Sequence, residues 1–161
     1  MFPERFSNLP AYAFPRLRAL LDVHEPGGPV VHMTIGEPKH AFPAWIGDII
    51  AQNMAGFNSY PPNEGTPELR AAICDWVKRR YGVTLDPATQ VMPLNGTREG
   101  LYNVGMALCP ETKNGAKPVV LMPNPFYQVY LISAISVAAE PVFVNATDET
   151  GHLPDFAALS K

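Results

Sequence analysis

The sequence predicts an α/β fold with a mostly parallel sheet, and three observations support this class. From residue 90 onward, strand-like segments alternate with helical segments. The segments 118–122 and 141–145 are nearly continuous apolar runs, as expected for parallel strands that are covered on both faces. Apolar residues make up 47% of the chain and charged residues 17%, which fits a globular protein with a core. We therefore expect parallel strands joined by helical crossovers.

The first third of the chain predicts two helices and one strand. Residues 14–21 form a short helix, and residues 30–35 are strand-like. A second helix opens at Pro43 and ends at Gly56. Its apolar face repeats at helical spacing and consists of Ile46, Ile49, Ile50 and Met54.

A helix with clear signals at both ends follows the polar, proline-containing loop 58–65. Thr66 is the expected N-cap, and Pro67 suits the first helical position. Glu68 complements the helix dipole. Gly82 comes directly after the last turn, where a glycine commonly ends a helix.

The second half of the chain predicts the sheet and its crossovers. Residues 90–94 form a short strand weakened by Pro93, and 118–122 and 141–145 form two further strands. Residues 126–138 form a helix that is apolar nearly all round, so we expect it to be buried. The helix after residue 95 has an apolar face made of Leu101, Val104, Gly105 and Leu108. Sheets of this kind usually have about five or six strands, so we expect the architecture to be interrupted at residue 161.

Charge and hydropathy exclude several functional classes. The formal net charge is -3, which does not suggest nucleic acid or an anionic membrane as a partner. No apolar run approaches the roughly 20 residues that span a bilayer, and residues 1–10 contain no signal-peptide core. Cys74 and Cys109 are expected to be buried small side chains in a reducing compartment. We predict a cytoplasmic protein without a metal site.

One candidate ligand site is the loop 95–98, which joins a predicted strand to a helix N-terminus. Ligands of open α/β sheets bind beyond the carboxyl ends of the strands. Gly96 allows close approach of a ligand, and Thr97 and Arg98 add donors suited to phosphate. The alternative is a simple helix cap. Dinucleotide and Walker A signatures are absent, which favours a phosphate carried by a smaller cofactor.

Aromatic residues form two further candidates. Phe126 and Tyr127 follow the strand 118–122, where an aromatic ring can stack on a planar ligand. The alternative is that both belong to the core. Tyr60 lies in a proline-rich loop, and composition alone favours a surface aromatic there.

Four segments resemble the fold-type I, class I/II aminotransferases. They are residues 35–38 (Ile-Gly-Glu-Pro), 60–70 (Tyr-Pro-Pro-Asn-Glu-Gly-Thr-Pro-Glu-Leu-Arg), 95–99 (Asn-Gly-Thr-Arg-Glu) and 122–128 (Met-Pro-Asn-Pro-Phe-Tyr-Gln). Order and spacing are similar as well, and the resemblance extends over roughly residues 10–160. It implies the N-terminal part of the three-layer α/β/α large domain of that family.

The resemblance also implies a division of the chain and a cofactor, pyridoxal 5'-phosphate. Residues 1–50 correspond to an N-terminal arm and small-domain segment, and residues 51–161 to the first part of the large domain. The resemblance places Gly96, Thr97 and Arg98 at the cofactor's phosphate, Tyr127 against its ring, Tyr60 at the partner subunit's cofactor phosphate, and Gly36 at the substrate carboxylate. A site shared between two chains implies a homodimer. An incomplete sheet would also expose apolar surface and favour association.

The resemblance further implies that the catalytic residues lie elsewhere. Transamination needs a lysine for the Schiff base and an acidic partner for the pyridine nitrogen. In the family both lie further along the chain than residue 161. No lysine of this sequence occupies a suitable place; the lysines considered are Lys39, Lys78, Lys113, Lys117 and Lys161. We therefore expect these 161 residues alone to be an inactive fragment.

The function implied by the resemblance is transfer of an amino group between an amino acid and a 2-oxo acid. The motifs are most similar to the succinyldiaminopimelate aminotransferase branch, which implies N-succinyl-diaminopimelate and glutamate as substrates. Three alternatives stay open. They are another fold-type I enzyme such as a lyase or decarboxylase, a non-catalytic module that binds a phosphate ligand, and a structural pairing domain.

Overall fold

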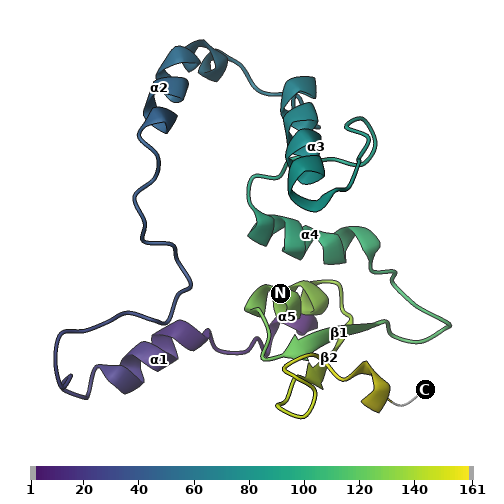
Figure 1. Cartoon of the computed structure of the whole chain (residues 1–161). Helices are drawn as coiled ribbons and strands as arrows, with labels where there is room; N and C mark the ends of the chain where they lie inside the picture. The colour runs from purple at the N-terminus through teal and green to yellow at the C-terminus, as the bar shows by residue number, and fades with distance from the viewer. Residues whose placement is uncertain (1–2, 160–161) are drawn as a thin grey trace. The chain divides into compact units, whose positions relative to one another are not determined.

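The computed structural model describes residues 3–159, and the chain divides into two compact units (Figure 1). One unit comprises residues 12–93. The other comprises residues 94–159 together with residues 3–11. The predicted domains, 1–50 and 51–161, are defined by family architecture rather than by contacts within this chain, and they stay a prediction.

The unit of residues 12–93 is helical. It contains α1 (Ala13–Leu21), α2 (Trp45–Gln52), the 3-10 helix η2 (Met54–Asn58) and α3 (Pro67–Tyr81). The helices predicted at residues 14–21 and after Thr66 are confirmed, and the single helix predicted from Pro43 to Gly56 is divided into α2 and η2.

The ends of α3 follow from its sequence. The Thr66 side chain accepts a hydrogen bond from the backbone N–H of Leu69 at 3.2 Å. Gly82 adopts the left-handed conformation with φ 70°, and its N–H donates to the carbonyl of Lys78. Both ends of this helix are therefore set by local signals, as predicted.

Two predicted strands are wrong. Neither residues 30–35 nor residues 90–94 pair with any segment among the described residues. Val31 and Met33 are 77% and 85% exposed. A strand needs a neighbour that takes up its backbone N–H and C=O groups, and in residues 90–94 Pro93 also lacks one donor. Apolar composition alone therefore overestimates the number of strands.

The unit that contains residues 94–159 carries the sheet. Its elements are η1 (Glu4–Phe6), α4 (Thr97–Leu108), β1 (Val119–Asn124), α5 (Gln128–Ser136), β2 (Glu140–Asn145) and η3 (Phe156–Ala158). The strands β1 and β2 are parallel, in a register that runs from Val119 opposite Glu140 to Asn124 opposite Asn145. The predicted order of strand, helix and parallel strand is confirmed here, with two strands in place of the three expected.

The core of this unit lies where α5 contacts the two strands (Figure 1). Its buried residues are Met122, Ala134 and Ala139. The partly buried residues packed against them are Cys109, Val120, Phe126, Tyr130, Leu131 and Val137. Every residue of α5 is buried or half-buried, as its apolar sequence predicted, although the helix begins at Gln128 rather than at residue 126.

Small residues mediate the contact between α4 and α5. A Cβ atom added to Gly105 would collide with the hydroxyl of Ser133, which donates a hydrogen bond to the carbonyl of Tyr102 at 2.7 Å. The Tyr102 hydroxyl donates to Ser136 at 2.9 Å, and Ser136 donates to the carbonyl of Ile132 at 2.8 Å. The close approach of the two helices at Gly105 lets these polar groups form hydrogen bonds with one another.

The predicted apolar face of α4 is therefore not its main contact face. Leu101, Val104 and Leu108 are 41%, 53% and 77% exposed. Of the predicted set, Gly105 lies directly against Ser133 of α5. The spacing of large apolar residues does not reveal a contact that depends on the absence of a side chain.

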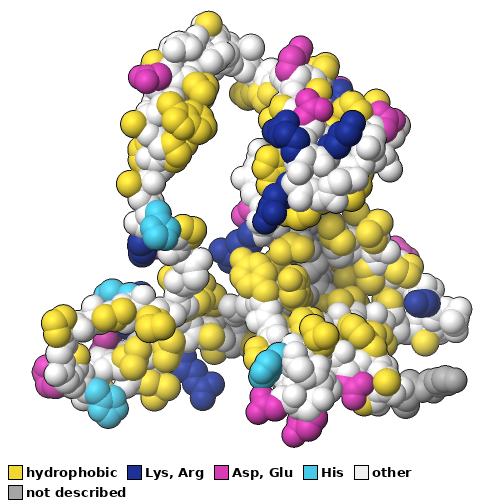
Figure 2. Space-filling model, viewed as in Figure 1, with side chains coloured by type: hydrophobic (Ala, Val, Ile, Leu, Met, Phe, Trp, Pro, Cys, Tyr) yellow, Lys and Arg dark blue, Asp and Glu magenta, His cyan; other side chains and the backbone are white. Residues whose placement is uncertain are grey.

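Large hydrophobic side chains are exposed in both units, and Figure 2 shows many of them. On α2, Trp45 is 60% exposed and Ile49 and Ile50 are each 49% exposed. No helix within residues 3–159 has the length and apolar character needed to cross a bilayer.

Candidate functional site

The N-terminus of α4 presents backbone amides that no described residue engages. Gly96 is the N-cap, and the first helical hydrogen bond runs from the N–H of Gly100 to the carbonyl of Gly96 at 3.1 Å. Among residues 3–159, no side chain caps this turn, and the N–H groups of Thr97, Arg98 and Glu99 have no acceptor. Such amides, together with the helix dipole, form a surface suited to an anion.

Side chains of the same turn add to its affinity for an anion. Thr97 and Arg98 are exposed, and Arg98 makes no ion pair with any described residue. The guanidinium is therefore available to pair with a phosphate. We name the amides and side chains of Gly96, Thr97 and Arg98 the phosphate cradle.

Gly96 matters because it has no side chain, and not because it allows an unusual backbone angle. Its φ of 169° is extended backbone that any residue adopts. A Cβ atom at this position would lie 2.5 Å from the Oε2 atom of Glu99. The place of a side chain at Gly96 is therefore taken by a glutamate oxygen, and the donors of the turn fit a phosphate group.

The two aromatic residues after β1 have different surroundings. The Phe126 ring packs on Phe143 of β2, with 5.0 Å between the ring centroids. Tyr127 is the N-cap of α5 and is 45% exposed; its ring meets Tyr130 edge to face at 5.8 Å. Phe126 thus belongs to the core, whereas Tyr127 keeps accessible ring surface. The structure places Tyr127 at the start of the helix that packs against α4.

A pair of asparagines, which the sequence analysis missed, joins the carboxyl ends of the two strands. The Nδ2 atom of Asn124 donates to Oδ1 of Asn145 at 2.9 Å, and the N–H of Ala146 donates to the carbonyl of Asn124 at 2.9 Å. These bonds hold the sheet edge from which the loop to Tyr127 departs. Only the strand register reveals the pairing, because the two residues lie 21 positions apart.

Glu99 is a second residue without a predicted role. It is the third residue of α4, the position at which a glutamate can reach back toward the N-cap. A glutamate at this helical position is a feature that could have been recognised from the sequence. Its contact with Gly96 brings a negative charge to the cradle.

Tyr60 and Gly36 belong to the unit of residues 12–93. The Tyr60 side chain is 101% exposed, in the loop between η2 and α3. No described atom lies within 4 Å of a Cβ atom built on Gly36. The contacts within this unit do not test either role, and both stay predictions.

Among the described residues, Lys117 lies away from the carboxyl edge of the sheet, and the other lysines are exposed. Lys117 pairs with Glu140 at 3.1 Å, at the amino ends of β1 and β2. Lys39 pairs with its neighbour Glu37 and is exposed. Lys161 lies outside the described residues. Lys117 therefore lies at the end of the sheet opposite to the one beyond which ligands of open α/β sheets bind.

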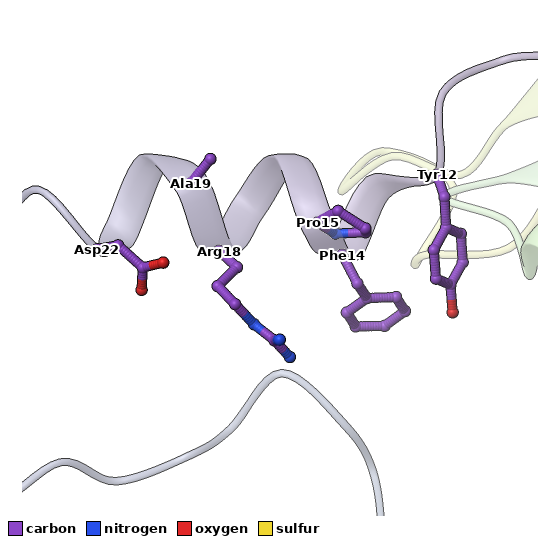
Figure 3. A pocket seen from close by; sticks show the side chains of 6 residues that line it. All are labelled: Tyr12, Phe14, Pro15, Arg18, Ala19 and Asp22. Atoms are coloured by element: carbon purple, nitrogen blue, oxygen red, sulfur yellow. The ribbon is translucent and has the colours of Figure 1, made fainter.

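An open hollow of about 300 Å³ lies along α1 (Figure 3). Its lining residues are Tyr12, Phe14, Pro15, Arg18, Ala19 and Asp22. All of them come from one helix and its two flanking residues, and none belongs to the cradle. The hollow has no converging set of polar groups around a ligand, so it is not the candidate site.

Two carboxylates have a lowered pKa, and both hold turns. The pKa of Asp86 is lowered by hydrogen bonds from the Thr89 hydroxyl and the Ala88 N–H. The pKa of Glu149 is lowered chiefly by a hydrogen bond from Thr147. Stabilisation of a carboxylate by local donors explains both shifts without a catalytic role.

Comparison with known families identifies the family of this chain. The family model "Aminotransferase class I and II" matches residues 28–161. The chain therefore belongs to the class I and II aminotransferase family.

Curated relatives include LL-diaminopimelate aminotransferases. The protein of Dehalococcoides mccartyi is 33% identical over 160 residues, and the match covers 97% of this chain and 40% of that protein. The protein of Aquifex aeolicus is 33% identical over 161 residues, covering 98% of this chain and 40% of that protein. The chain thus spans about 40% of the length of these relatives.

Solved structures confirm the fold. An aminotransferase from Neisseria meningitidis is 33% identical with a TM-score of 0.88, covering 99% of this chain and 41% of that chain. The N-succinyldiaminopimelate aminotransferase from Mycobacterium tuberculosis is 29% identical with a TM-score of 0.62, covering 70% of this chain and 28% of that chain. The predicted fold class, the N-terminal part of this transferase fold, is correct.

Proposed function

We propose that this chain forms the cofactor-phosphate side of a pyridoxal-phosphate-dependent aminotransferase. The observation that carries the proposal is the phosphate cradle, whose amides and Arg98 have no partner among residues 3–159. The cradle falls within the part of the chain matched by the aminotransferase family. The amino group would pass between an amino acid and a 2-oxo acid.

Each residue of the site has a distinct task in this proposal. The amides of the cradle and the Arg98 guanidinium hold the phosphate, and the Thr97 hydroxyl donates to it. Tyr127 offers its ring to one face of the cofactor, and Gly36 offers its backbone to the substrate carboxylate. When bound, pyridoxal phosphate supplies an electron sink for bond breaking at the substrate. In this proposal the residues of this chain bind the cofactor and orient the cofactor and the substrate.

Replacing Arg98 or Thr97 should weaken binding of pyridoxamine 5'-phosphate. This probe has no aldehyde, so it cannot form an imine with a surface lysine. Loss of one hydrogen bond to a charged group should weaken binding about tenfold to a hundredfold for Arg98→Ala, and less for Thr97→Ala. Isothermal titration calorimetry on the 161-residue chain measures the effect.

The matched control is Arg79→Ala, which removes the same charge from the exposed last turn of α3. Its affinity for the probe should stay within about twofold of the unsubstituted chain, because Arg79 is an exposed charge outside the cradle and is screened by solvent and salt. A structural pairing domain would instead give the same phosphate affinity for Arg98→Ala and the control. That result would reject the proposal.

We further infer that the 161 residues do not run transamination by themselves. The placement of Lys117 supports this, because it lies at the amino ends of β1 and β2 and not at the carboxyl edge of the sheet. A single-turnover assay with excess chain, pyridoxal phosphate and glutamate should show no conversion to pyridoxamine phosphate above the protein-free rate. Amine-dependent conversion that exceeds this rate would overturn the inference.

The substrates and the assembly rest on the family. Relatives are named for LL-diaminopimelate, and one solved relative for N-succinyldiaminopimelate. We propose an amino acid substrate with a diaminopimelate skeleton. The specific candidate is N-succinyl-diaminopimelate, which would give its amino group to 2-oxoglutarate and form glutamate, or receive it from glutamate in the reverse direction. The exposed Tyr60 supports a homodimer in which this side chain reaches the partner's cofactor phosphate. A cytoplasmic location stays a prediction.

A further inference from the structure

The side chain of Glu99 folds back over the N-cap of its own helix. Its Oε2 and Cδ atoms lie 2.5 Å and 3.6 Å from the position of a Cβ atom on Gly96. Since Gly96 has extended backbone, its conformation does not require a glycine. The volume that the missing Cβ leaves over the cradle is thus taken up by a carboxylate oxygen.

The carboxylate has a physical reason to stay there. A negative charge in the first turn is stabilised by the partial positive charge of the amides at the helix N-terminus. Among the described residues, Glu99 forms no ion pair that would draw its carboxylate elsewhere. The same amides belong to the phosphate cradle. A phosphate on the cradle would therefore meet a like charge at very short range.

We propose that Glu99 sets the affinity of the cradle by competing with the cofactor phosphate for it. This inference rests on the proposed function, because it assumes that a phosphate binds at Gly96, Thr97 and Arg98. Phosphate entry displaces the carboxylate from Gly96, and part of the binding free energy is spent on that displacement. Glu99 is a positioning residue and takes no part in the reaction.

The substitution Glu99→Gln tests the competition. Glutamine keeps the size of the side chain and removes its charge, so the repulsion disappears while the fold of this exposed turn is kept. Binding of pyridoxamine 5'-phosphate and of inorganic phosphate should become about tenfold tighter, the effect of removing one like charge at short range. Titration calorimetry on the full 161-residue chain measures both probes.

The control Glu111→Gln makes the same charge change at an exposed residue outside α4. Its affinity should stay within about twofold of the unsubstituted chain, because a solvent-exposed charge at longer range is screened. Equal gains in Glu99→Gln and Glu111→Gln would overturn the inference, since net charge would then explain the result. A Glu99→Gln chain that binds no tighter, or more weakly, would overturn it as well.

A second measurement does not depend on a variant. In the unsubstituted chain, the ¹³C resonance of the Glu99 carboxyl carbon should shift when inorganic phosphate is added, together with the amide resonances of the cradle. Amide shifts without a change at the Glu99 carboxyl carbon would overturn the inference and leave the proposed function standing. Equal phosphate affinity in the unsubstituted chain and Arg98→Ala, or no binding in any variant, would reject both.

Discussion

Replacing Gly105 with alanine should loosen the contact between α4 and α5. The new methyl group would collide with the Ser133 hydroxyl, and Ser133 is only 5% exposed and cannot move into solvent. Overpacking of this kind destabilises by about 1–3 kcal/mol, which exceeds the gain of about 1 kcal/mol from the better helix propensity of alanine. We expect a net loss of up to about 2 kcal/mol in the stability of this contact.

Hydrogen exchange of the α4 and α5 amides, followed by mass spectrometry, measures this loss. Exchange is the suitable probe because Trp45 and Trp76 both lie in the unit of residues 12–93, so tryptophan fluorescence does not report on α4. Faster exchange should be confined to these two helices and their neighbours.

Two variants separate the collision from other effects. Gly47→Ala changes a glycine inside α2 with no described atom within 4 Å of the new methyl group, so it should stabilise by up to about 1 kcal/mol. In a Ser133→Ala background the collision partner is gone, and Gly105→Ala should then have little effect. An equal loss with and without the Ser133 hydroxyl would contradict the explanation.

Replacing Gly65 with alanine should destabilise the loop that precedes α3. Gly65 has φ +80°, and a Cβ atom there would lie 2.6 Å from Cγ of Pro93. The strain of an alanine in left-handed backbone and the collision with the rigid proline ring add together. We therefore expect the free energy of unfolding to fall by about 2–4 kcal/mol. Urea unfolding followed by tryptophan fluorescence measures it, because Trp76 lies in α3.

Gly82→Ala is the matched control. Gly82 has φ +70° and no described atom within 4 Å of the new methyl group, so only the left-handed strain applies. The free energy of unfolding of the Gly82→Ala variant should fall by about 1 kcal/mol. The double variant Gly65→Ala/Pro93→Ala should recover the difference between the two glycines. If both glycine variants lose the same stability, contact with Pro93 is unimportant.

The candidate site was partly predictable from the sequence. The phosphate cradle follows from consecutive residues at a helix start, so its donors are encoded within one turn. The distinction between Phe126 and Tyr127 was not predictable, because it depends on Phe143 of β2, which supplies a packing partner for Phe126 alone. The Asn124–Asn145 hydrogen bond likewise requires the register of two strands.

The sequence by itself determined the features that depend on near neighbours along the chain. The ends of α3 at Thr66 and Gly82 are set by one side-chain cap and one left-handed glycine. The tertiary structure decided which apolar segments become strands and which face of α4 makes contact. Residues 90–94 have strand composition but lack a partner among residues 3–159, whereas β1 and β2 have each other. Backbone hydrogen bonds between strands and the close approach at Gly105 both require a second secondary-structure element. The position of that element cannot be predicted from neighbouring residues in the sequence.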